Sequence, residues 1–168
     1  MTVKNNKRTV FGWAMYDWAN SAYSTTTVGA LMPAYFAAVV VGEDGWNFGG
    51  TNYLADEIWG YATGIVIFIF FLIMPVFGAM ADMSGSKMKF LRIFAYGGSV
   101  FATVMFFLTA GDVWLTLFLY LGAQFGFVGS LVFNDGLLRD ITTEDTIDQV
   151  STRAVSYTHL TLPTSDLV

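Results

Sequence analysis

Four long apolar stretches dominate this sequence and limit what the chain can fold into. They cover residues 16–41, 58–80, 90–110 and 113–133. Each is about 20 residues long or longer, the length that an α-helix needs to cross the hydrocarbon core of a bilayer. Only 12% of the residues are charged, against about 25% in soluble domains. We therefore expect an all-α integral membrane protein with about four transmembrane helices.

The placement of lysine and arginine predicts how these spans are oriented. All basic residues lie before the first span, at the junction of the second and third, or after the fourth: Lys4, Lys7, Arg8, Lys87, Lys89, Arg92, Arg139 and Arg153. The connections on the other side hold acidic residues instead: Glu43, Asp44, Asp56, Glu57 and Asp112. Cytoplasmic loops carry an excess of basic residues. We expect the N-terminus, the loop between spans two and three, and the stretch after span four to be cytoplasmic, in a bacterial inner membrane.

The remaining composition excludes several classes of function. The chain has no cysteine, which rules out disulfides and thiolate metal sites. Its formal net charge is −5 and no basic run is present, which argues against nucleic acid as a partner. It lacks a phosphate-binding glycine loop and the common hydrolase motifs. We expect no enzyme activity, no cofactor and no metal.

Polar residues inside the spans are the candidate site. Ionisable and amide side chains are costly in a bilayer and usually face a cavity or a partner. Asp17 either caps the helix at the membrane boundary or lines a pathway with the polar residues that follow it: Asn20, Ser21, Ser24 and Thr25. Pro33 is expected to kink this helix. Gln124 in the fourth span is interpreted first as a hydrogen-bonding partner between helices, and second as a solute contact.

Glycines mark two expected packing positions and one turn. The pairs Gly60–Gly64 and Gly122–Gly126 have the spacing that lets helices approach closely in lipid. The junction of the second and third spans reads GAMADMSGSKMK, in which Gly85 permits a tight turn. By itself, this junction is a solvated turn that carries positive charges.

The same junction resembles the signature of the major facilitator superfamily. The matching residues are Gly78, Asp82, Gly85, Lys87 and Lys89, while Met83 and Ser86 stand where that family commonly has arginine. In the family, this loop forms a cytoplasmic latch between the two halves of a transporter. The resemblance implies that these residues belong to a cytoplasmic gate.

Two further segments resemble one branch of that superfamily, the vacuole effluxers linked to amino-acid export. One is YDWANSAYSTTT with PAYF closing the helix, and the other is SLVFNDGLLRDIT, in which Asn134 and Asp140 match and Arg139 replaces a proline. The matches extend from about Trp13 to Ala154. They imply that residues 1–154 are the N-terminal part of a twelve-helix, two-bundle transporter that works by alternating access.

This resemblance also implies partners and roles. The partners would be a small solute (an amino acid in this branch), a coupling proton, the lipid bilayer, and the helices missing from this chain. The first span would line the central cavity, and a buried Asp17 could carry the proton. The alternative is a self-contained four-span protein that acts as a scaffold or an assembly subunit.

The last segment, residues 155–168, differs abruptly from the rest. Residues 155–164 read VSYTHLTLPT, which has no helical period and is the residue-for-residue translation of one frame of a transposon-end sequencing adapter. We expect this segment, including His159, to be an artefact of assembly, with the native frame continuing after Ala154. A genuine polar tail is the competing interpretation.

Overall fold

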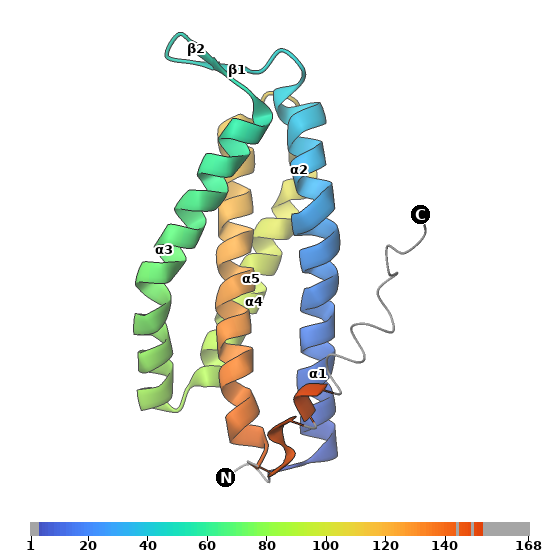
Figure 1. The fold of residues 1–168 in the computed structure, drawn as a ribbon, viewed down its shortest axis with the longest axis vertical. Helices are drawn as coiled ribbons and strands as arrows, with labels where there is room; N and C mark the ends of the chain where they lie inside the picture. The colour runs from blue at the N-terminus through green and yellow to red at the C-terminus, as the bar shows by residue number, and fades with distance from the viewer. Residues whose placement is uncertain (1–3, 144, 149, 153–168) are drawn as a thin grey trace.

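The structure is a computed structural model that describes residues 4–143, 145–148 and 150–152. Four long helical spans form an elongated bundle with a small hairpin at one end (Figure 1). All four are long and apolar enough to cross a membrane, as the sequence predicts. The segment interpreted as an artefact, with His159, lies outside the described residues.

The first span is continuous from Lys7 to Val41 and changes its helical type along its length. It consists of α1 (Lys7–Ala22), the π-helical segment η1 (Tyr23–Leu31), α2 (Met32–Tyr35) and the π-helical segment η2 (Phe36–Val41). The side chain of Asn6 caps it by accepting hydrogen bonds from the N–H groups of Arg8 and Thr9, at 3.0 and 3.4 Å. The helix therefore begins well before the predicted residue 16, and Asp17 is not its cap.

Pro33 does not end this helix. It lies in the first turn of α2, where the backbone remains right-handed helical on both sides. Proline removes one N–H donor from a helix and crowds the preceding turn. The π-helical segments on either side have a different hydrogen-bonding pattern, and they accommodate the proline where the sequence predicts a kink.

The connection after the first span contains a β-hairpin that the sequence analysis missed. Strands β1 (Trp46–Phe48) and β2 (Thr51–Tyr53) pair antiparallel, with Trp46 opposite Tyr53. Gly49 and Gly50 have positive φ angles of 61° and 88°, which a two-residue hairpin turn requires. In the sequence, the Gly49–Gly50 pair was the feature that could have indicated this hairpin turn.

The other three spans start close to their predicted first residues, but the second and the fourth extend past their predicted ends at residues 80 and 133. They are α3 (Ala55–Ser84), α4 (Lys87–Val104), which continues through the 3₁₀ turn η3 (Met105–Phe107), and α5 (Val113–Ile141). The third span ends before the predicted residue 110. There the Asp112 carboxylate accepts hydrogen bonds from the hydroxyl and N–H of Thr109, at 2.6 and 3.0 Å. These bonds hold the pKa of Asp112 below its ordinary value of 3.8.

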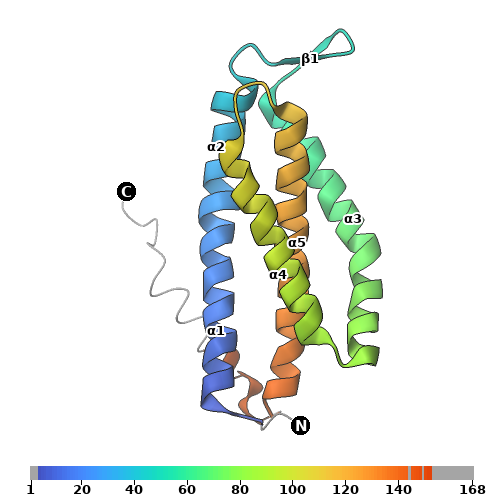
Figure 2. The same cartoon turned by 180° about the vertical axis from the view of Figure 1, so that it is seen from behind.

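Helix α5 is the centre of the bundle. It lies between α1 and α3, with α4 crossing behind it (Figures 1 and 2). Phenylalanine rings fill the space between α3, α4 and α5, and Phe94 contacts the rings of Phe77, Phe125 and Phe133. The start of α1, the α3–α4 turn and the end of α5 lie together at one end of the bundle (Figure 1). We call it the basic end, because it carries the described lysines and arginines, and the hairpin end the acidic end.

The structure shows close helix packing at one of the two predicted glycine pairs and not at the other. A Cβ added to Gly98 of α4 would lie 2.9 Å from the Cα of Gly126, and one added to Gly122 would meet the ring of Phe101. The Gly122–Gly126 pair therefore packs closely against α4, as the sequence predicts. Gly60 and Gly64 have open space where a Cβ would be, so within the described residues the prediction of close packing is wrong for that pair.

This difference predicts unequal effects of the same substitution. Gly126→Leu should destabilise the bundle by about 1–3 kcal/mol, because the added side chain overpacks the crossing with Gly98. Gly64→Leu is the matched control and should change stability little, since its side chain enters open space. Thermal unfolding in detergent measures both. Equal melting temperatures for the two variants would contradict the close α4–α5 crossing.

Candidate functional site

Helix α5 lies between α1 and α3 with α4 behind it, so α4 leaves one side of the described bundle uncovered (Figures 1 and 2). Asp17, Ser21 and Ser24 are spaced four and three residues apart, so they share one face of the first span. Asp17 lies close enough to Asp135 of α5 for the two carboxylates to repel each other. We call this side, between α1 and α3 and over α5, the open face.

Gln124 of α5 belongs to a cavity on the α3 side of this face. The cavity measures about 250 Å³ and is lined by α3 and α5, including Thr63, Phe70 and Tyr120. The side-chain oxygens of Gln124 and Thr63 are buried and have no hydrogen-bond partner among the described residues. Gln124 therefore does not form the expected hydrogen bond between helices within this part of the chain.

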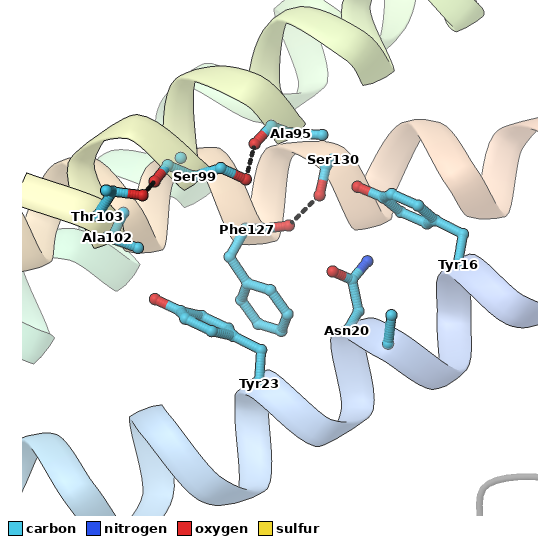
Figure 3. Close-up of a pocket in the computed structure, with 12 residues that line it drawn as sticks. Tyr16, Asn20, Tyr23, Ala95, Ser99, Ala102, Thr103, Phe127 and Ser130 are labelled. Carbon is cyan, nitrogen blue, oxygen red and sulfur yellow. Dashed lines mark hydrogen bonds between the residues drawn. The ribbon is translucent and has the colours of Figure 1, made fainter.

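Asn20 lines a different cavity, on the opposite side of the α1–α5 contact. This back cavity of about 440 Å³ lies between α1, α4 and α5. Figure 3 shows Tyr16, Asn20 and Tyr23 extending from the first span toward it. The Asn20 amide nitrogen and the Tyr23 hydroxyl are buried without a partner in the described residues. The hydroxyls across the cavity are already bonded, since Ser99 and Ser130 donate to backbone carbonyls of their own helices at 2.8 and 2.7 Å.

Two of the hydroxyls of the first span bond to their own helix. Ser21 donates to the carbonyl of Asp17 at 3.1 Å, and Thr25 donates to that of Ser21 at 3.0 Å. The predicted pathway residues are thus divided. Asp17, Ser21 and Ser24 share one face of the first span, and Gln124 lines the cavity between α3 and α5. Asn20 lines the back cavity, and Thr25 is exposed.

At the basic end, Lys87 links three helices. Its Nζ lies 3.0 Å from the Asp82 carboxylate at the end of α3 and 3.0 Å from the Asp140 carboxylate at the end of α5. It also donates to the carbonyl of Gly136 at 3.2 Å. The Lys87 side chain is only 18% exposed. This one cation therefore joins the start of α4 to the ends of both neighbouring helices.

Gly85 makes this arrangement possible. It has a φ of 61° and ends α3, and the N–H of Ser86 donates to the carbonyl of Ala81 at 3.2 Å. Such a left-handed cap favours glycine, and the tight turn places Lys87 beside Asp82. Of the other residues predicted for this loop, Lys89 is exposed and Gly78 has no atom within 4 Å of where its Cβ would lie.

A further contact at this end involves Asn134, which the sequence singled out. Its side chain is 2% exposed, and its backbone carbonyl accepts a hydrogen bond from the Trp13 indole at 2.8 Å. This bond ties α1 to α5. Sequence reasoning missed Trp13 as a contact residue. It also missed Asp135, because the fourth span was predicted to end at residue 133, whereas α5 continues to Ile141.

Long apolar helices, polar groups buried in cavities and a charged linkage at one end are the features of a polytopic membrane protein. The chain belongs to the family described as vacuole effluxer Atg22 like, which matches residues 5–157. It is 35% identical over 154 residues to the uncharacterized MFS-type transporter YxiO of Bacillus subtilis (strain 168). The family is one of transporters, and the resemblance to the major facilitator superfamily is confirmed.

The match with YxiO covers 90% of this chain but only 35% of the length of that relative. The chain thus spans about a third of the curated relative that it matches. No solved structure matches the chain significantly.

The linkage by Lys87 predicts strong coupling between charged residues. Lys87→Met keeps the length of the side chain but removes its charge, so the ends of α3 and α5 lose their shared partner. A double-mutant cycle with Asp140→Asn, measured by unfolding in detergent, should give a coupling free energy of about 0.5–3 kcal/mol. Lys89→Met, the control, should show no coupling to Asp140→Asn. Additive effects for Lys87 and Asp140 would contradict the linkage.

Proposed function

We propose that the complete protein is a secondary active transporter that moves a small solute across a membrane by alternating access. Support comes from the family, from the transporter relative, and above all from the polar residues that α1 and α5 carry within an otherwise apolar bundle. Polar groups inside a membrane usually line a substrate or ion pathway. In transporters built from two bundles, the solute lies near the middle of the membrane, between bundles that rock against each other.

In this proposal the open face is one wall of the solute pathway. Asp17, Asp135 and Gln124 offer carboxylate and amide groups, while the described lysines and arginines lie at the basic end. An ammonium group would therefore be the part of the solute held there, with water or a second bundle facing it. This chemistry suits amino acids, which the resemblance to the effluxer branch also implies. Asn20, in the back cavity, is not a solute contact in this arrangement.

The linkage of Lys87 to Asp82 and Asp140 acts as part of the gate. It holds the ends of α3, α4 and α5 together at the basic end, so these helices move as one body when the bundle rocks. The departures from the family signature at Met83 and Ser86 leave Lys87 as the cation that Asp82 meets. Membership of a transporter family disfavours the alternative of a four-span scaffold.

We further propose that the basic end is cytoplasmic and that the membrane is a bacterial inner membrane. The separation of charge supports this orientation, because lysine and arginine are retained on the cytoplasmic side. The bacterial source of the similar transporter supports the location.

Reporter fusions test the orientation. Alkaline phosphatase inserted after Gly50, in the hairpin, should be active because it would reach the oxidising side of the membrane, where its disulfides form. The same enzyme inserted after Gly85 should be inactive. The opposite pattern of activity would overturn the orientation.

Transport by the complete protein tests the role of Asp17. In proteoliposomes with an imposed pH gradient and the standard amino acids supplied one at a time, Asp17→Asn should slow coupled uptake at least about tenfold, which corresponds to about 1.4 kcal/mol. Thr25→Val is the control and should transport like the wild type, because its hydroxyl bonds only to its own helix. An unchanged rate for Asp17→Asn would sink its role as proton carrier. Failure of the wild type to transport any amino acid would exclude that solute class.

A further inference from the structure

The segment that precedes the first span is hydrogen-bonded to the C-terminal end of α5 and to the residues that follow it. The backbone N–H of Asn5 donates to the carbonyl of Ile141 at 2.8 Å. Its side-chain Nδ2 donates to the Thr143 hydroxyl at 3.0 Å, and its Oδ1 accepts from the Thr146 hydroxyl at 2.8 Å. One residue thus makes three hydrogen bonds to a segment that is distant from it in the sequence.

The chemistry of asparagine fits this position closely. Asn5 has a φ of 60° and is the only non-glycine residue with a positive φ in the described part of the chain. Asparagine is among the few residues that tolerate this left-handed conformation. Its side-chain amide donates a hydrogen bond to the Thr143 hydroxyl and accepts one from the Thr146 hydroxyl. Aspartate would lose the donor, and glycine would keep only the backbone bond.

Asn5 binds to the C-terminal end of α5, where the backbone carbonyls lack hydrogen-bond partners within the helix. Ile141 is the last residue of α5, and its carbonyl obtains a partner from Asn5. The next residue, Asn6, caps the start of α1. Two consecutive asparagines therefore join the last turn of α5 to the first turn of α1.

The same turn of α5 carries a carboxylate of the gate. Asp140 directly precedes Ile141 and lies 3.0 Å from Lys87. Half of the Asp140 side chain is exposed to solvent, so its reach to Lys87 depends on where the helix end is held. Asn5 holds that end from the side of α1, and Lys87 holds it from the side of α3 and α4.

We propose that Asn5 is a positioning residue for the gate, which fixes the last turn of α5 so that Asp140 stays within reach of Lys87. The N-terminal segment then serves as a clamp that couples the first span to the α3–α4 turn. This inference rests on the proposed role of the Lys87 linkage in transport. The clamp itself is a matter of geometry and can be tested without a solute.

Distances between spin labels in the complete transporter test this proposal. Labels are attached to cysteines at Met83, at the end of α3, and at Arg139, near the end of α5, after any native cysteines elsewhere have been replaced. Asn5→Gly keeps the left-handed backbone and removes the two side-chain bonds. It should raise the population with a long Met83–Arg139 distance about fivefold, as expected for the loss of hydrogen bonds of this kind. Asn47→Gly, the same change at an exposed position of β1 at the acidic end, should leave the distances unchanged.

Lys87→Met provides the decisive comparison. If Asn5 acts through Asp140 and Lys87, Lys87→Met alone should lengthen the distance, and Asn5→Gly should add little to it. Additive effects, or an unchanged distance in Asn5→Gly, would overturn the positioning role. Thr146→Val removes one of the three bonds to Asn5, together with the contacts of the Thr146 hydroxyl to Thr143. It should shift the distance in the same direction as Asn5→Gly, so that the proposal does not depend on the folding of one variant.

The outcomes separate this inference from the proposed function. If the distances respond as expected but proteoliposomes of the wild type transport no solute, the transporter proposal fails and the clamp stands. If solute moves normally and Lys87→Met lengthens the distance while Asn5→Gly does not, the clamp fails and the transporter proposal stands.

Discussion

The absence of water from the hydrocarbon core of a bilayer is the constraint on which this structure depends. Backbone N–H and C=O groups must find their partners within the segment, because lipid offers none. The spans are accordingly continuous helices, and even Pro33 is accommodated by a change of helical type. Side-chain hydroxyls also need partners within the protein. Accordingly, each of four hydroxyls donates to a carbonyl of its own helix: those of Ser21, Thr25, Ser99 and Ser130.

A second consequence is that helices in lipid associate through close packing and polar contacts, because burial of apolar surface gives little advantage there. Helix α5 uses both. Its glycines allow α4 to approach until Gly98 meets Gly126, and its end accepts the charge of Lys87. The polar groups that are not satisfied in these ways, such as those of Gln124 and Asn20, lie in cavities.

Much of the fold follows from the sequence, because length and apolar character decide whether a segment can span a membrane. The four spans were predicted for this reason, although the first begins at Lys7, since polar residues such as Asn6 and Arg8 cap and extend a helix beyond its apolar part. The hairpin was missed because its strands are too short to show alternation. The site was predicted only in part: a pattern identifies Asp17 as unusual, but it does not show that Asp135 lies beside it.

The sequence by itself determined the class of protein, the number of spans and the separation of charge between the two ends, because each of these depends on local composition. The tertiary structure alone decided which residues meet. It placed Asn20 and Asp17 in different surroundings, paired Lys87 with Asp140, and brought Asn5 to the end of α5. Such contacts depend on how helices rotate and cross, and that is set by the sum of packing over the whole bundle.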